Sequence, residues 1–207
     1  MKDIYIIGSG GFSKEVYFLI KQIGGYQIKG FVDIEQQEDI LINNEYVSVI
    51  SEDNLISTFP GSCLAIGLGN PKLIAKVSEK FNNFIFPNLI HPSVIFNDNK
   101  IIMGNGNIIT SGVIFTTNIQ VGSFNVFNLS STIGHDVVIG HCNVINPSVN
   151  ISGGVQIGSN NLFGVSSTIL QNKSIGNNSV IGASSLVVKN VLDNLVVFGV
   201  PAKVFKK

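Results

Sequence analysis

The sequence predicts two parts: an α/β N-terminal domain of the Rossmann-like βαβ type, followed by an all-β parallel β-helix made of hexapeptide repeats. An apolar residue returns at every sixth position from Met103 to Val187, and glycine often follows it. The first ninety residues instead alternate strand-like and helix-like stretches. A six-residue period fits neither the 3.6-residue period of a helix nor strand–helix alternation, so the second part is expected to be a rod of stacked coils.

The repeated positions are aliphatic or aromatic without exception: Met103, Ile109, Phe115, Val121, Phe127, Ile133, Ile139, Ile145, Ile151, Ile157, Phe163, Ile169, Ile175, Ile181 and Val187. The next residue is glycine at positions 104, 122, 134, 140, 158, 164, 176 and 182. Because glycine and asparagine tolerate positive φ, each hexamer is expected to be a short strand and a tight corner. If three hexamers make one triangular coil, residues eighteen apart stack in three interior columns, and functional groups lie outside them.

The N-terminal residues have the order strand, glycine turn, helix, strand and acid. Residues 2–7 are a predicted buried strand, Gly8-Ser9-Gly10-Gly11 the turn, and Asp33 the acid after the second strand. Such a pattern is typical of nucleotide binding, with backbone N–H groups facing a phosphate and the acid meeting a ribose or base. Ser13 stands where a dinucleotide fingerprint has its third glycine, which argues against NAD. A purely structural turn is the alternative.

A third strand is expected at 63–67 and a helix at 72–80, with Asn70 between them. Carboxyl ends of parallel strands face one crevice, so Gly10, Asp33 and Asn70 are predicted to converge. The segment 34–62 is polar and is predicted to be a loop with one short strand. Because helix patterns stop and hexamers begin near residue 90, we predict domains at 1–90 and 91–207, the second ending in a short basic tail.

Bulk properties exclude several classes of protein. The chain of 207 residues has thirteen basic and thirteen acidic residues, so neither nucleic acid nor an anionic membrane is expected as a partner. The apolar run before Gly8 is too short for a signal peptide or a membrane span, which predicts a cytoplasmic protein without membrane insertion. Cys63 and Cys142 are isolated and are expected to be buried thiols without a disulfide.

Three histidines raise the question of a zinc site, because a hexapeptide rod with histidine ligands is a known enzyme design. His135 and His141 lie one hexamer apart, so they occupy the same slot on successive faces and cannot meet at one ion. His91 precedes Pro92 near the predicted domain boundary and is expected to be a polar junction residue. We therefore predict no metal site.

The pair His135-Asp136 is a candidate for acid–base chemistry. In register, both residues fall in the corner after Gly134, outside the core. A neutral imidazole is a natural general base, and an adjacent carboxylate fixes its tautomer. Gly153 stacks eighteen residues later, where a missing side chain lets a substrate approach and a backbone N–H face an oxyanion. Taken alone, the pair also fits an ordinary polar corner.

A set of motifs in order along the chain resembles the PglD-like nucleotide-amino-sugar acetyltransferases, which are grouped with the NeuD-like sialic acid O-acetyltransferases. The matching pieces are Ile7-Gly8-Ser9-Gly10-Gly11-Phe12, Phe31-Val32-Asp33, Ile66-Gly67-Leu68-Gly69-Asn70-Pro71, Ile90-His91-Pro92-Ser93, Ile133-Gly134-His135-Asp136-Val137-Val138-Ile139-Gly140, Ile145-Asn146-Pro147 and Gly199-Val200-Pro201-Ala202-Lys203. The resemblance covers nearly the whole chain.

The resemblance implies a left-handed β-helix, a homotrimer, and acetyl-CoA bound along the groove between neighbouring rods. It implies that His135 takes a proton from the sugar amine and that Asp136 raises the basicity of His135. It further implies that the Gly153 N–H stabilises the tetrahedral intermediate.

The resemblance also assigns binding residues. For the nucleotide part of the sugar these are Gly10, Gly11, Phe12, Asp33 and Asn70. For acetyl-CoA they are Val144, Gly153, Gly164, Val165, Gly182 and Ala183. Many relatives carry a second histidine, contacting the acetyl donor, nine residues after the catalytic one; this chain has Val144 there. His141 comes three residues earlier and points to another face.

These observations together predict an acetyl-CoA-dependent N-acetyltransferase without a metal. Its predicted acceptor is the amine of a UDP- or dTDP-linked 4-amino-4,6-dideoxy sugar for surface-glycan synthesis, such as O-antigen or lipopolysaccharide. Direct transfer is expected, because no Cys or Ser nucleophile motif accompanies His135. The alternatives are a sugar O-acetyltransferase, a non-catalytic solenoid that binds sugar nucleotides, and a metal-dependent hydratase with the same rod.

Overall fold

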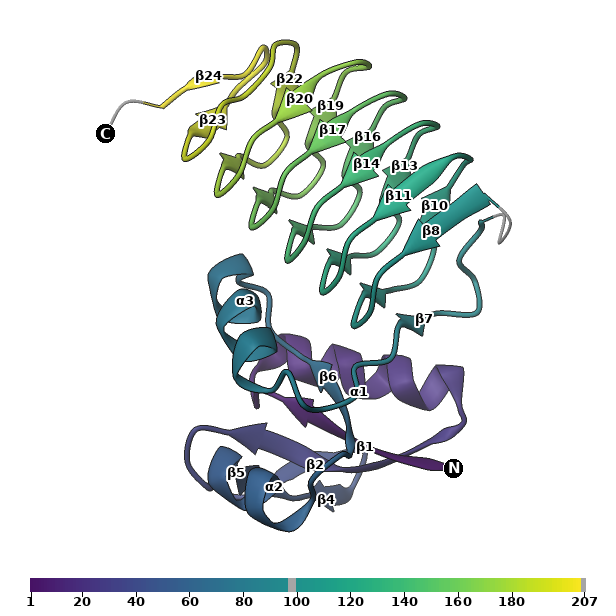
Figure 1. Ribbon diagram of the computed structural model, residues 1–207, viewed down its shortest axis with the longest axis vertical. Helices are drawn as coiled ribbons and strands as arrows, with labels where there is room; N and C mark the ends of the chain where they lie inside the picture. Colours follow the sequence, from purple (N-terminus) through teal and green to yellow (C-terminus); the bar gives the residue numbers. More distant parts are fainter. Residues whose placement is uncertain (97–99, 206–207) are drawn as a thin grey trace.

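The computed structural model describes residues 1–96 and 100–205, and the last two residues of the predicted basic tail lie outside this range. Figure 1 shows an α/β part at the N-terminal end and a rod of stacked coils above it. In the described residues, no helix combines the length and apolar character that a membrane crossing requires. The fold class predicted from the sequence, a Rossmann-like domain followed by a left-handed parallel β-helix, is confirmed.

A four-stranded parallel sheet in the order β5-β2-β1-β6 forms the centre of the N-terminal part. Its strands are β1 (Lys2–Ile7), β2 (Tyr26–Asp33), β5 (Val49–Ser51) and β6 (Cys63–Ile66). The chain leaves β1 toward β2 on one side and later returns to β6 on the other. Ligands of such sheets bind at this change of direction, beyond the carboxyl ends of the two central strands.

Three helices accompany the sheet: α1 (Gly11–Ile23), α2 (Glu52–Thr58) and α3 (Pro71–Lys80). The prediction for 34–62 was wrong in part, because this segment contains α2, β5 and the hairpin of β3 (Ile40–Ile42) and β4 (Glu45–Val47). Helix α2 begins where the Ser51 hydroxyl accepts the Asn54 N–H at 3.1 Å. This cap stabilises a short helix whose own apolar pattern is weak.

Gly67, which directly follows β6, takes over the packing role of the glycine that is missing at position 13. The Ser13 hydroxyl donates to the Gly67 carbonyl at 2.9 Å, and a Cβ on Gly67 would lie 2.8 Å from Ser13 Cα. Helix α1 therefore approaches β6 closely because residue 67, rather than residue 13, lacks a side chain.

The rod begins at β7 (Leu89–Ile90), which pairs with β9. Its further strands are β8 (Ile101–Met103), β9 (Ile108–Ile109), β10 (Ile114–Phe115), β11 (Ile119–Val121), β12 (Val126–Phe127), β13 (Thr132–Ile133), β14 (Val138–Ile139), β15 (Val144–Ile145), β16 (Asn150–Ile151), β17 (Gln156–Ile157), β18 (Leu162–Phe163), β19 (Thr168–Ile169), β20 (Ser174–Ile175), β21 (Val180–Ile181), β22 (Leu186–Val187), β23 (Val196–Phe198) and β24 (Lys203–Val204).

These strands form three parallel sheets, β10-β13-β16-β19-β22, β20-β17-β14-β11-β8 and β24-β23-β21-β18-β15-β12-β9-β7, with only β23 and β24 antiparallel. From β8 to β22, each residue pairs with the one eighteen positions away, as Phe127 does with Ile109 and Ile145. Each sheet thus carries one of the three predicted columns. The repeated residues are buried, except Met103, which is partly buried.

The glycines after the repeated residues have a different cause from the one predicted. None of those eight has positive φ; that conformation falls on the third residue after each repeated one from Met103 to Ile181, for example Asn118 (57°) and Asp136 (59°). A Cβ on Gly122 would lie 2.4 Å from the Gly140 carbonyl oxygen of the next coil. Glycine is therefore needed there because successive coils stack too closely for a side chain.

A buried asparagine ladder, missed in the sequence analysis, runs through one corner of the rod. Asn107, Asn125, Asn143 and Asn161 are all 0% exposed. Asn125 Oδ1 accepts the backbone N–H of Asn143 at 2.9 Å and its side-chain amide at 3.0 Å, and the pattern repeats along the ladder. Asparagine at every eighteenth position, two before the apolar residue, was the available signal.

The two parts of the chain share one apolar core. Ile108, Val126, Cys142 and Val144 from one face of the rod belong to the cluster that contains the strands and helices of the N-terminal domain. The rings of Phe86 and Phe124 meet edge to face across this contact, 5.1 Å apart. Cys63 and Cys142 are buried free thiols, as predicted.

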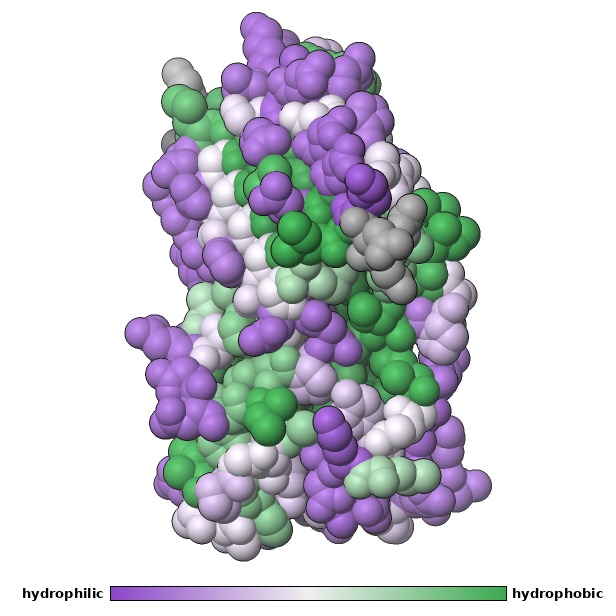
Figure 2. Space-filling model, turned by 45° about the vertical axis from the view of Figure 1, so that its right-hand side comes forward, coloured by the Kyte–Doolittle hydropathy of each residue, from purple (hydrophilic) through white to green (hydrophobic). Residues whose placement is uncertain are grey.

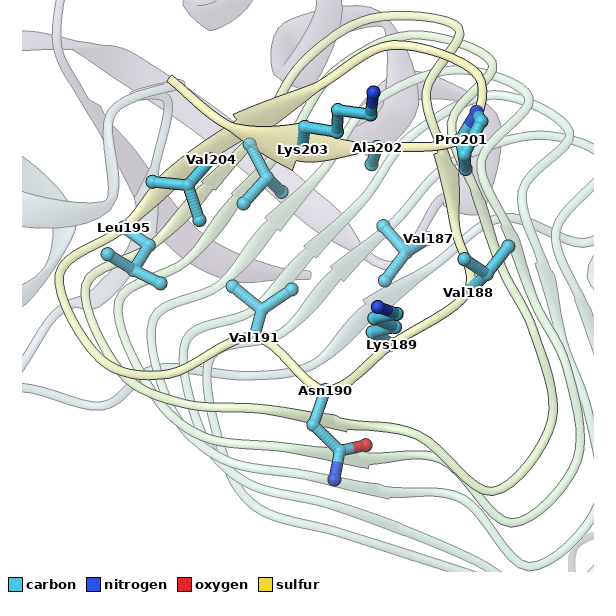
Figure 3. Close-up of a pocket in the computed structure, with 11 residues that line it drawn as sticks. Val187, Val188, Lys189, Asn190, Val191, Leu195, Pro201, Ala202, Lys203 and Val204 are labelled. Carbon is cyan, nitrogen blue, oxygen red and sulfur yellow. The ribbon is translucent and has the colours of Figure 1, made fainter. Parts of the chain in front are cut away.

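The far end of the rod is only partly closed by the hairpin of β23 and β24. A cavity of about 320 Å³ remains there. Figure 3 shows Val187, Val191 and Leu195 pointing into it, while Asn190 points away. The lining is mostly aliphatic, so this cavity is the open end of the core.

The asparagine ladder yields the first prediction. Asn143→Ala removes an amide that donates to Asn125 Oδ1 and to the Gly158 carbonyl, and it leaves the buried Asn161 N–H without an acceptor. We expect a loss of about 2–3 kcal/mol in the free energy of unfolding, measured by urea denaturation. Asn150→Ala, at an exposed strand position, is the matched control. Equal losses in the two variants would contradict a special role for the ladder.

Candidate active site

His135 and Asp136 occupy the corner that follows β13, where the chain turns outward after Gly134. The turn is set by the positive φ of Asp136, whose backbone N–H donates to the Thr117 carbonyl of the preceding coil at 3.1 Å. Aspartate is one of the few residues besides glycine that tolerates this conformation. Both side chains leave the core and lie on the outside of the rod.

The His135 Nδ1 and Asp136 Oδ2 atoms are 2.7 Å apart. The pKa of Asp136 is held below its ordinary value, first by the hydrogen bond with His135 and then by one from Asn118. Asp136 is therefore a carboxylate at neutral pH, and in the neutral imidazole the proton lies on Nδ1. This leaves the Nε2 lone pair free to accept a proton.

The imidazole lies directly against Gly153 of the next coil. A Cβ on Gly153 would be 2.5 Å from His135 Nε2 and 2.6 Å from Cε1. Within the described residues, no oxygen accepts a hydrogen bond from the Gly153 N–H. The corner thus combines a proton acceptor with an unused backbone donor.

This corner is open in the single chain. The side chain of His135 is 66% exposed and that of Asp136 is 58% exposed. An exposed hydrogen bond of this kind contributes little to stability. The arrangement therefore calls for an explanation other than stability.

The other two histidines have structural contacts. His141 Nδ1 accepts the Ser123 N–H at 3.0 Å, and the backbone N–H of His141 donates to the Ser159 hydroxyl. His91 Nδ1 accepts the Ser93 N–H at 3.0 Å where the rod begins. His141 thus belongs to a series of corner hydrogen bonds and does not replace the histidine missing at position 144.

Val144 does not reach the outside of the rod. It lies in β15, is 1% exposed, and packs in the core shared with the N-terminal domain. A side chain there contacts the N-terminal domain. The structure therefore places this predicted donor contact away from the His135 corner, because the α/β domain covers that face of the rod.

The remaining predicted donor positions follow a different corner of the triangle. Val165 and Ala183 are exposed and stack on each other one coil apart, after β18 and β21, whereas His135 follows β13 in another sheet. A Cβ on Gly164 would lie 2.4 Å from Ala183 N, and one on Gly182 would lie 2.6 Å from Phe198 Cβ. Both glycines are thus explained by stacking. One chain does not bring these positions to His135.

A second candidate site is a pocket of about 440 Å³ at the carboxyl ends of β1 and β2. Gly10 and Asp33 line it as predicted, and the Ser9 hydroxyl donates to Asp33. Lys76 and Lys80 of α3 also line it, with Glu52 paired to Lys80. The sequence analysis missed these charged side chains because they come from outside the strand-end motifs.

The other predicted nucleotide-binding residues lie beside this pocket instead of lining it. Gly11 is the first residue of α1, and Phe12 packs against the domain core. Asn70 begins α3, where its Oδ1 accepts the N–H groups of Lys72 and Leu73 at 3.0 and 3.3 Å. The amide oxygen of Asn70 is therefore used to cap the N-terminus of α3.

In the described part of the chain, no three His, Cys, Asp or Glu side chains are grouped so that they could hold a metal ion.

Comparisons with known proteins agree with this architecture. Residues 3–81 match the family model of the PglD N-terminal domain. No curated protein matches the sequence in a direct search. Among solved structures, PerB from Caulobacter crescentus, in complex with CoA and GDP-perosamine, is 26% identical with a TM-score of 0.89, covering 100% of this chain and 98% of its own.

Two further structures match over the full length. The acetyltransferase domain of PglB from Neisseria gonorrhoeae FA1090, in complex with acetyl coenzyme A, is 23% identical with a TM-score of 0.89, covering 99% of each chain. WeeI from Acinetobacter baumannii AYE is 23% identical with a TM-score of 0.85, covering 99% of this chain and 100% of its own. Together with the matching N-terminal domain, they agree with the resemblance to PglD-like sugar acetyltransferases seen in the sequence, and the whole chain has the fold of these proteins.

Proposed function

We propose that the protein transfers the acetyl group of acetyl-CoA to the amine of a nucleotide-linked amino sugar. The observation that carries this proposal is the His135 corner: an imidazole held by a carboxylate, with Nε2 free and an unused Gly153 N–H beside it. PerB, 26% identical over 98% of its length, was solved with CoA and GDP-perosamine, which supports the two substrate classes.

In the proposed reaction, His135 Nε2 accepts a proton from the amine as the nitrogen attacks the thioester carbonyl. Asp136 holds the Nδ1 proton and stabilises the imidazolium that forms. The Gly153 N–H donates to the carbonyl oxygen as it gains negative charge. The thioester C–S bond breaks, the proton taken up by His135 passes to the sulfur, and CoA leaves as the thiol, so no covalent bond to the enzyme is required.

We propose that the site is completed by a second copy of the chain in a homotrimer. Val165 and Ala183 lie on a different corner from His135, so a neighbouring rod has to bring its own Val165–Ala183 corner to the His135 groove if these positions hold the donor. Figure 2 shows apolar surface gathered on one side of the rod. Ile95 and Ile114 pair side by side on one face of the rod and are exposed, and a neighbouring copy would cover them.

We further propose that residues 1–90 hold the nucleotide and residues 91–207 perform the transfer. The pocket with Ser9, Gly10 and Asp33, at the point where strand order changes, supports the first assignment. Lys76 lines the same pocket and provides positive charge for a diphosphate, while Lys80 is paired with Glu52. The sugar is proposed to be a 4-amino-4,6-dideoxy sugar on UDP or dTDP for surface-glycan synthesis in the cytoplasm, by the resemblance stated above.

Replacing the proposed base gives the central prediction. His135→Ala should lower kcat by about 10²–10⁴-fold, because general base catalysis typically contributes this much. Binding of the sugar nucleotide should be retained, because its pocket lies in the N-terminal domain. Thiol release measures turnover, and calorimetric titration measures binding. Full activity in this variant would favour a non-catalytic role for the corner.

Gly153→Ala tests the contact between the ring and the next coil. The new Cβ would lie 2.5 Å from His135 Nε2, so the imidazole must move. We expect kcat to fall about 10–100-fold without a change in melting temperature, because the end of a side chain moves more easily than backbone. In a chain that already carries His135→Ala, adding Gly153→Ala should lower kcat little further. If the fall in kcat of the double variant equalled the product of the falls in the two single variants, displacement of the ring would be contradicted.

The acceptor chemistry can be tested with paired substrates. Amino and hydroxy forms of the same sugar, each on UDP, dTDP and GDP, should show a clear preference for the amine in kcat/KM. A neutral amine is the better nucleophile, and His135 needs to remove its proton only as the bond forms. A preference for the hydroxy sugar would instead identify an O-acetyltransferase.

A further inference from the structure

We propose that Asn118 is a positioning residue for acetyl transfer, which holds the Asp136 carboxylate in the orientation that directs His135. This inference rests on the proposed function of the His135 corner. It adds a residue from the preceding coil, so that three side chains in series, Asn118, Asp136 and His135, set the ring orientation.

The contacts divide the two carboxylate oxygens between two partners. Asn118 Nδ2 donates to Asp136 Oδ1 at 3.2 Å, while Asp136 Oδ2 faces His135 Nδ1 at 2.7 Å. A carboxylate held at only one oxygen can rotate about its last side-chain bond, and the ring that it holds turns with it. The amide fixes the second oxygen and so removes this freedom.

The backbone makes the contact possible. Asn118 and Asp136 occupy the same corner of successive coils and both have positive φ, 57° and 59°. The next residue in this stack is Gly154, which has no side chain to offer the carboxylate. Asn118 is therefore the only neighbour within this described stack that donates to Asp136 from an adjacent coil.

The pKa of Asp136 also supports a positioning role for Asn118. The hydrogen bond from Asn118 is the second cause, after that from His135, that lowers the pKa of Asp136. An amide that donates to a carboxylate favours the charged form, which is the form needed to hold the Nδ1 proton.

Asn118 could also be explained by its positive φ alone, without a role in positioning Asp136. Asparagine also occupies the positive-φ corner at Asn160, Asn172 and Asn178, where the conformation alone accounts for it. Asn172 is the matched control: it lies in the same stack, two coils beyond Asp136, with a φ of 57°, and it makes no hydrogen bond to Asp136 in the described structure.

The experiment compares Asn118→Gly with Asn172→Gly in the full-length protein, because glycine keeps the backbone conformation and removes only the amide. For Asn118→Gly we expect kcat to fall about 3- to 10-fold with KM and melting temperature unchanged. Asn118→Asp, which keeps the shape but places a second negative charge beside Asp136, should lower kcat further. Asn172→Gly should match the wild type.

A second readout follows the carboxylate itself. In protein labelled with ¹³C at the aspartate carboxyl carbons, and assigned with Asp136→Asn, the pKa of Asp136 should rise toward its ordinary value in Asn118→Gly and not in Asn172→Gly. A merely structural role for Asn118 would not move this titration.

The outcomes separate this inference from the proposed function. Wild-type acetylation that survives Asn118→Gly unchanged, an Asp136 pKa that does not move, or an equal loss in Asn172→Gly would each overturn the role of Asn118 alone. A wild-type protein that acetylates no sugar nucleotide would overturn the proposed function and this inference with it.

Discussion

The stacking of coils at a fixed eighteen-residue interval is the constraint on which the rest of the rod depends. Backbone hydrogen bonds hold successive coils about 4.8 Å apart, so each side chain meets the one eighteen positions away at the same corner. That spacing excludes a Cβ at Gly122, and it lets one asparagine bond to the next along the ladder. The same interval sets Gly153 under His135 and Asn118 beside Asp136, so the candidate site is a local use of the rule that builds the fold.

Sequence reasoning succeeds where this interval is visible as a period. The three apolar columns and the stacking of Gly153 on His135 follow from counting alone, because the side chains concerned repeat or stand out chemically. The reason for the glycines could not be derived in this way. Glycine is compatible both with positive φ and with close approach, and only coordinates show that Asn118, Asp136 and their equivalents carry the positive φ.

Contacts between the N-terminal domain and the rod could not be predicted from the sequence either. Val144 looks in sequence like any outward strand residue of the rod, yet the α/β domain covers it. Such burial depends on how separate elements dock, which no single-chain period encodes. The same holds for Lys76 and Lys80, which reach the pocket at the carboxyl ends of β1 and β2 from α3. Asn70 differs from these residues. The sequence analysis predicted it as a ligand contact, and in the structure it caps the N-terminus of α3.

The rod also explains why catalysis would need more than one copy of the chain. A triangular coil sends its corners in different directions, so residues on different corners of one rod cannot face one another across a groove. His135 and the pair Val165 and Ala183 lie on different corners, and each remains exposed. In the proposed homotrimer, a neighbouring rod would present its own corner to the first, and the groove between them could then hold one substrate against side chains from two chains. The exposure of an ordered imidazole and carboxylate in the single chain is thus what a shared site requires, since a site closed within one chain would leave no room for the second.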